Sequence, residues 1–488
     1  MSDHSAPLPS TTTTLINNAA WVIAWDASRQ AHTYRTDIDV AFAGDRITFI
    51  GKDFDGKADR VIDGRERMVM PGLIDAHTHP TTEPSFKGIR EEHGVTRMGN
   101  SGLYERMIAY KLDEEGRKAA LEVAYAEMLA SGVTTVVDLS SPFDDWTDLV
   151  DKSGIRAFLA PGYRSAEWRL EPDFSLHFDW DEAAGRRGFE AALKLIDSLP
   201  SHPSGRISGV VFPGQIETVS VDLFKDSIAA ARERGLPITT HIAQSTNELA
   251  ELEKRHGMSP IEFADHIGLL GDNCLLAHAI FLDHHHLVDR KPYRDIARLA
   301  ETGTSVVHCP TPVSRYGHQL ENFGNYARAG INMAIGTDVS PHNILEEMRT
   351  ALIMARTAAG SITAVSTPEV LNAATIGGAR SMLRDDLGKL ETGAKADIVL
   401  VDLEDPNMIP ARDPLRSLLY TAAERAVCDV FVDGRQVVKD RKVLTLDRLD
   451  AAHRLAEGQR RMMDAAPSRD FLGRTADEIT PISLPLVS

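Results

Sequence analysis

The sequence predicts a (β/α)8 TIM barrel joined to a small β-sandwich that both ends of the chain build together. Between residues 69 and 338, eight short apolar runs rich in β-branched residues alternate with helical segments. Strands that alternate with helices pair in parallel through right-handed crossovers, and eight such units in this length have the size of a barrel. A doubly wound open sheet is the alternative, but no glycine-rich phosphate loop follows the first run.

Most gaps between the predicted strands have helical periodicity. Residues 181–197 and 221–235 are two clear examples, and the second ends at a glycine, as helices often do. The predicted barrel strands, in chain order, cover residues 69–76, 134–139, 156–163, 207–214, 237–243, 274–280, 305–310 and 332–338.

The two flanks of the barrel carry short β-branched runs between glycine and aspartate turns, a pattern typical of antiparallel strands. We therefore expect residues 1–68 to form one half of the β-sandwich, with residues 1–14 as a disordered lead, and residues 389–446 to form the other half. Residues 69–388 form the expected barrel. A terminal amphipathic helix and tail are expected over residues 447–488.

The composition predicts a cytoplasmic protein that acts on a small molecule. A net charge of −18 over 488 residues opposes binding to nucleic acid or to an anionic membrane. The sequence contains neither an apolar run long enough to span a bilayer nor a recognisable signal peptide. Its cysteines are few, odd in number and far apart, which favours a reduced compartment. The acidic surface and the terminal helix suit a homodimer.

Polar side chains end five of the eight predicted strands. In a barrel, the carboxyl ends of the strands converge on one face, where active sites lie. Imidazole nitrogens and carboxylate oxygens that meet there suit a single divalent metal ion. These strand-end residues are His77, His79, His241, His278, His308 and Asp338.

Seven short motifs occur in the order found in a known family. They are PGLIDAHTH at 71–79, GVTTVVD at 132–138, THIA at 240–243, LAH at 276–278, VHCP at 307–310, GTD at 336–338 and GKLETGAKADIV at 388–399. With them, nearly the whole chain resembles the amidohydrolase superfamily, in its branch of cytosine deaminase-like and s-triazine hydrolase-like enzymes.

This resemblance implies a ligand set and two catalytic roles. His77, His79, His241 and Asp338 would bind the metal, and Asp338 would also take a proton from its water. His278 would hydrogen-bond the attacking water or the substrate oxygen. Some members hold two metals on a carboxylated lysine, but residues 210–217 contain no lysine. One metal is therefore expected, with zinc first and iron, cobalt or manganese as alternatives.

Gln244 departs from the family pattern. The deaminating members have a glutamate three residues after the fifth-strand histidine, and that glutamate protonates a ring nitrogen. An amide cannot carry this proton. An acyl group already has a carbonyl oxygen that the metal can polarise. The sequence therefore predicts hydrolysis of an amide, urea or (thio)carbamate C–N or C–S bond, as in molinate hydrolase and the phenylurea hydrolases.

Two other functions remain open. The first alternative is an aminohydrolase or chlorohydrolase of a heteroaromatic ring, such as a pyrimidine, purine or s-triazine, in which another acid replaces the missing glutamate. The second is a non-catalytic homologue that binds metal, which ranks last because no ligand is missing.

Five further residues are candidates for binding the substrate. Four of them have a structural alternative: a loop salt bridge for the arginine, a helix cap for the two residues after the last strand, and a supporting hydrogen bond for the seventh-strand histidine. Glu217, near the fourth strand, is a weaker candidate for a second metal site, and a helix start or a surface carboxylate is its default role. Residues 80–133, an unusually long first βα segment, are expected to shape the pocket. The five candidates are Arg164, Gln215, His308, His342 and Asn343.

Overall fold

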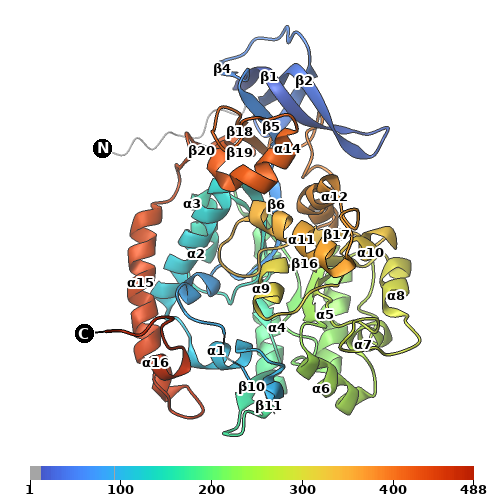
Figure 1. Ribbon diagram of the computed structural model, residues 1–488, viewed down its shortest axis with the longest axis vertical. Helices are drawn as coiled ribbons and strands as arrows, with labels where there is room; N and C mark the ends of the chain where they lie inside the picture. Colours follow the sequence, from blue (N-terminus) through green and yellow to red (C-terminus); the bar gives the residue numbers. More distant parts are fainter. Residues whose placement is uncertain (1–11, 93, 322, 488) are drawn as a thin grey trace.

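The computed structural model describes residues 12–92, 94–321 and 323–487. It contains the predicted barrel and, above it in Figure 1, a sheet built from both chain ends. The predicted fold class is therefore confirmed.

Eight positions around the barrel are filled by parallel strands. One four-stranded sheet has the order β12-β8-β7-β6 and another has the order β14-β15-β16-β17. Single parallel bridges from Thr78 to Asp338 and from Val211 to Ile238 join the edges of these sheets, so the barrel is closed. The strands are β6 (Leu73–Thr78), β7 (Val133–Asp138), β8 (Arg156–Leu159), β12 (Ile207–Gly209), β14 (Ile238–Ile242), β15 (Cys274–His278), β16 (Ser305–His308) and β17 (Met333–Ile335).

Three predicted strands are divided in the structure. Residues 69–71 of the first belong to β5 (Arg67–Pro71), which pairs with β18 (Ile398–Asp402) outside the barrel. Gly72 lies between β5 and β6, where a Cβ atom would come within 2.0 Å of Thr134 Oγ1. The third and fourth strands continue as the short β9 (Gly162–Tyr163) and β13 (Phe212–Pro213), which pair in parallel. A proline, which cannot donate a backbone hydrogen bond, lies at two of these breaks. Pro71 ends β5, and Pro161 lies between β8 and β9.

The helices lie outside the barrel strands. The two segments predicted as helices form α4 (Glu182–Ser198) and α5 (Val221–Arg234), and Gly235 ends α5 with a φ of 62°. The predicted terminal helix is α15 (Arg448–Asp464), which packs along α2 (Glu114–Ala130) (Figure 1). The other barrel helices include α3 (Trp146–Ser153), α6 (Thr246–His256), α7 (Pro260–His266), α8 (Asp295–Thr302), α10 (Phe323–Arg328) and α11 (Ile344–Ala359).

The terminal sheet has nine strands in the order β21-β20-β19-β18-β5-β1-β2-β3, with β4 paired to β1. Its buried core includes Ile16, Val40, Leu400 and Phe431. Of the predicted disordered lead, residues 1–11 lie outside the described residues, while Thr13 begins β1. These strands are β1 (Thr13–Asp26), β2 (Ala31–Ala43), β3 (Arg46–Gly51), β4 (Arg60–Asp63), β19 (Val427–Val432), β20 (Arg435–Lys439) and β21 (Lys442–Val443).

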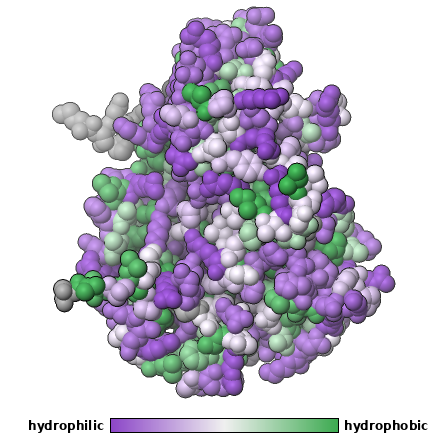
Figure 2. Space-filling view, viewed as in Figure 1, coloured by the Kyte–Doolittle hydropathy of each residue, from purple (hydrophilic) through white to green (hydrophobic). Residues whose placement is uncertain are grey.

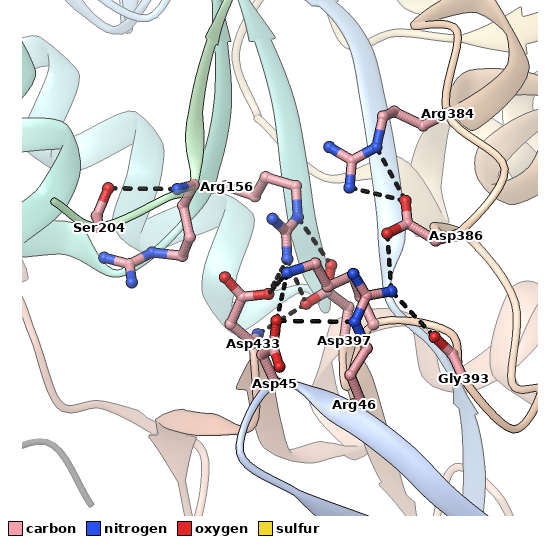
Figure 3. A network of polar contacts seen from close by, with 11 residues as sticks. Asp45, Arg46, Arg156, Ser204, Arg384, Asp386, Gly393, Asp397 and Asp433 are labelled. Carbon is pink, nitrogen blue, oxygen red and sulfur yellow. Dashed lines mark hydrogen bonds and ion pairs between the residues drawn. The ribbon is translucent and has the colours of Figure 1, made fainter. Parts of the chain in front are cut away.

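A buried ion network joins the amino-terminal end of the barrel to this sheet (Figure 3). Arg156, the first residue of β8, is 1% exposed. Its Nε and Nη2 each donate to an oxygen of Asp397 at 3.1 Å, and Nη2 also donates to Asp433. Every charge of this Arg156 network therefore has an opposite charge in contact.

The described part of the chain holds no helix that is both long and apolar enough to cross a membrane. The face shown in Figure 2 is mostly hydrophilic, with hydrophobic residues in small groups. Cys274, Cys309 and Cys428 are all buried and form no disulfide.

Candidate metal centre

Three histidines and one aspartate converge at the carboxyl end of the barrel. His79 Nε2 lies 3.2 Å from His241 Nε2 and 3.3 Å from Asp338 Oδ1, while His77 Nε2 lies 3.4 Å from the same oxygen. A tetrahedral site with bonds of 2.0–2.1 Å has ligand atoms about 3.3 Å apart. The three histidine side chains can together hold a metal ion, and this spacing fits one.

The orientation of two imidazoles is fixed by backbone carbonyls. His79 Nδ1–H donates to Leu139 O at 3.0 Å, and His241 Nδ1–H donates to Gly214 O at 3.0 Å. Because Nδ1 carries the proton in each ring, the lone pair of Nε2 faces the centre. This pattern of support is common for metal-binding histidines.

Close contact between β6 and β17 brings His77 and Asp338 together. Gly336 approaches His77 so closely that a Cβ atom on it would lie 2.7 Å from His77 O. The buried Asp75 accepts hydrogen bonds from the Thr337 hydroxyl at 2.6 Å and from the Thr337 backbone N–H at 3.0 Å. These contacts fix the backbone on both sides of the ligands.

The electrostatics of the centre keep Asp338 ionised and His278 neutral. Burial alone would raise the pKa of Asp338, but the close contact with His77 and the neighbouring histidines lower it overall. Burial lowers the pKa of His278 to about 4. A carboxylate that can accept a proton therefore lies beside an imidazole that can donate or accept one hydrogen bond.

A cavity opens directly above the metal centre. His79, His241, His278 and Asp338 all line it. Much of its wall is apolar or aromatic, which suits a flat small molecule. The apolar lining residues include Met98, Met107, Trp168, Phe281 and Val313.

Two predicted residues, Gln215 and Gln244, line this cavity. The Gln215 Oε1 atom accepts from the Thr218 hydroxyl at 3.0 Å, and the Gln244 backbone N–H donates to Glu248 at 3.0 Å. Gln244 thus lines the cavity from a turn that the buried Glu248 holds.

Four other predicted residues do not line this cavity. The Arg164 Nε–H donates to Glu167 Oε1 at 2.7 Å. His342 Nδ1 lies 3.0 Å from Thr337 Oγ1, and Asn343 caps the first turn of α11. His308 is buried without facing the cavity.

Glu217 also lies outside the cavity lining. It is 1% exposed, and in the described part of the chain neither of its carboxylate oxygens has a hydrogen-bond partner. Burial raises its pKa to about 7.

Sequence reasoning missed several cavity residues from the long first βα segment and from the loop after β16. Glu83 follows His79 by four residues, so its closeness to a strand end was the one available signal. The other missed residues lie in helices or loops, and their positions in the sequence gave no such signal. The missed polar residues of these two segments include Glu83, Arg106, Tyr316 and His318.

Most of the chain matches the model of one known protein family. Residues 68–437 match the model of the family described as the amidohydrolase family. The chain is 30% identical to a 5-methylthioadenosine/S-adenosylhomocysteine deaminase of Natronomonas pharaonis over 80% of this chain and 85% of the relative. It is 29% identical to a 5′-deoxyadenosine deaminase of Methanosphaera stadtmanae over 81% and 88% of the two chains.

Solved structures show the same fold. An adenosine deaminase from Xanthomonas campestris with bound zinc superposes with a TM-score of 0.80 and 25% identity, covering 93% of this chain and 99% of that one. An atrazine chlorohydrolase from Arthrobacter aurescens complexed with zinc superposes with a TM-score of 0.77 and 25% identity, covering 91% and 100%.

Proposed function

Since the chain belongs to the amidohydrolase family, we propose that it is a zinc-dependent aminohydrolase that replaces an amino group on a heteroaromatic ring by oxygen. Relatives that match most of the chain are named deaminases of adenine nucleosides. Their names favour the ring alternative over the acyl substrates that Gln244 alone predicts. A 5′-substituted adenine nucleoside is therefore the first substrate to test.

The convergence of the three Nε2 atoms and Asp338 Oδ1 below a partly aromatic cavity carries this proposal. A zinc ion held there would supply a water whose pKa is lowered towards about 7. His77, His79, His241 and Asp338 are the proposed ligands.

Three side chains have proposed roles in the reaction. Asp338 is ionised and close to the ligand atoms, so it accepts the proton of the attacking water and passes it to the departing ammonia. His278 holds one hydrogen bond to the oxygen that attacks. Gln244 hydrogen-bonds the substrate without exchanging a proton, so the ring nitrogen takes its proton from another acid. Gln215 contacts the substrate beside Gln244.

Hydrolysis of an amide, urea or carbamate is the second candidate function. Gln244 favours it, because an acyl substrate needs no protonated ring nitrogen before water adds. The same centre and the same role of Asp338 serve both reactions.

A substrate panel separates the two candidates. Zinc-loaded protein is assayed for ammonia release from 5′-deoxyadenosine, 5′-methylthioadenosine and adenine, and for hydrolysis of amides, ureas and carbamates. Turnover of the ring amines with the corresponding hypoxanthine product supports the proposed function. Turnover restricted to the acyl substrates replaces it by the second candidate.

We also propose that the protein works as a homodimer in the cytoplasm. The acidic composition and the three buried thiols support this assignment. Light scattering coupled to size-exclusion chromatography tests the dimer, and a mass of one chain would contradict it.

A further inference from the structure

Two charged side chains that no step of the proposed reaction uses lie in the wall of the metal cavity. Glu83 begins the 3-10 helix η1 (Glu83–Phe86), and its backbone N–H donates to His79 O at 3.0 Å. Arg106 lies in α1 (Leu103–Ala109), in the long first βα segment. Both line the cavity beside His79 and Asp338.

This pair is buried but poorly bonded. Glu83 and Arg106 are each 6% exposed. Arg106 Nη2 lies 3.8 Å from Glu83 Oε1, which is too far for a hydrogen bond. The Nε–H of Arg106 has no partner among the described residues, and the guanidinium lies over the Phe86 ring at 4.4 Å.

Arg156 shows how this chain satisfies a buried arginine that has only a structural role. Arg156 is 1% exposed, less than the 6% of Arg106, and its Nε and Nη2 each donate a hydrogen bond to Asp397 at 3.1 Å. A buried charge with unmet hydrogen bonds is costly. Arg106 keeps an unpaired hydrogen-bond donor among the described residues at the wall of a cavity, where a bound molecule can accept a hydrogen bond from it.

We propose that Arg106 and Glu83 together bind the substrate, through a neutral polar group that presents a hydrogen-bond acceptor beside a donor. Hydroxyl groups and amides have this chemistry. The assignment rests on the proposed function only in placing the substrate in this cavity, and it holds for either class of reaction.

Because Arg106 and Glu83 carry opposite charges, the pair favours a neutral ligand group over a charged one. Among the described residues that line the cavity, Arg106 is the one lysine or arginine, and Glu83 is the one carboxyl group besides Asp338. A ligand carboxylate would be attracted by Arg106 but repelled by Glu83, and a ligand ammonium would meet the reverse. A donor beside an acceptor satisfies both without this conflict.

The test uses zinc-loaded protein and whichever panel substrate has the highest kcat/KM. In Arg106→Met, we expect KM to rise about 10- to 100-fold, the usual loss when a hydrogen bond to a charged group is removed, while kcat changes less than about threefold. Arg106→Lys should recover part of this loss, since it keeps the charge without the planar donor set.

Arg315→Met is the matched control. Arg315 pairs with Glu91 at 3.3 Å near the same segment but does not line the metal cavity. We expect its KM to equal that of the wild type. Zinc content and thermal unfolding, measured on each variant, confirm that the fold and the centre are intact.

Glu83→Gln tests the neutral class separately. The probes are 5′-deoxyadenosine and its 5′-carboxylate analogue, with binding measured by calorimetry. Removing the negative charge should shift the preference at least about tenfold towards the carboxylate. A wild-type KM in Arg106→Met, or an unchanged preference in Glu83→Gln, overturns the assignment. Failure of the proposed function is distinct, because it appears in the substrate panel of the wild type.

Discussion

The barrel buries one group of titratable side chains at each end, and the two groups are bonded in different ways. At the amino-terminal end, the Arg156 network pairs each charge with an opposite one across the boundary to the terminal sheet (Figure 3). At the carboxyl end, neither ring nitrogen of His77 has a hydrogen-bond partner among the described residues, and Asp338 faces three imidazoles.

This difference distinguishes charged side chains that stabilise the fold from those that are available to a ligand. A buried ion pair with complete hydrogen bonding holds two domains in register and leaves nothing for a ligand. The metal centre instead keeps lone pairs and a carboxylate directed at one point, at a cost that bound metal offsets. Four substitutions test this comparison.

Asp338→Asn has the largest expected effect. The amide keeps the shape of the side chain but cannot accept the proton of the attacking water, so kcat should fall about 10²- to 10⁴-fold. Steady-state kinetics on the best panel substrate measures it, with zinc content determined in parallel. A kcat within tenfold of the wild type would show that another group accepts the proton.

Arg156→Met should cost about 3–5 kcal/mol of unfolding free energy, because it leaves the buried Asp397 without its cation, while Asp433 keeps Lys395 at 3.3 Å. Denaturant unfolding measures the loss, and kcat per folded molecule should remain unchanged. Arg46→Met is the control, since its pair with Asp386 at 2.9 Å is half-exposed and should contribute only about 0–1 kcal/mol. Equal losses in both variants would contradict the comparison.

Gln244→Glu places a proton-carrying group in the cavity. Ring deamination should rise by about tenfold, below the 10²- to 10⁴-fold that is typical of general acid catalysis, because the site has not adapted to the carboxyl group. Hydrolysis of acyl substrates should not rise. A ratio of the two activities equal to that of the wild type would mean that residue 244 does not choose the substrate class.

His32→Gln, in the terminal sheet, has the smallest expected effect. Burial lowers the pKa of His32 to about 4 from an ordinary value of 6.5. The unfolded chain therefore takes up this proton at a higher pH than the folded chain. The stability contribution is complete above pH 6.5 and is lost as pH falls towards 4.

The His32→Gln variant should lose less stability than the wild type over this interval, by on the order of 1 kcal/mol. Urea unfolding at a series of pH values measures the difference. Parallel pH profiles of the two proteins would show that His32 is not buried as a neutral group.

The barrel, the terminal sheet and the gathering of the candidate metal ligands were predictable because their signals are local. The alternation of short strands with helices predicts the barrel. A polar residue at the carboxyl end of any barrel strand lies on the same face of the barrel, whatever the place of that strand in the sheet. The division at Gly72 was not predictable, because residues 69–71 are as apolar as a barrel strand and differ only in the sheet that they join.

The sequence by itself determined the family, the order of the strands and the set of atoms that can hold a metal, since these depend on residue type and spacing. Tertiary structure alone decided which other side chains line the cavity. It placed Arg106 and Glu83 there and left Arg164 outside. The physical reason is that a pocket wall is formed where separate loops pack, and no periodicity within one segment specifies that packing.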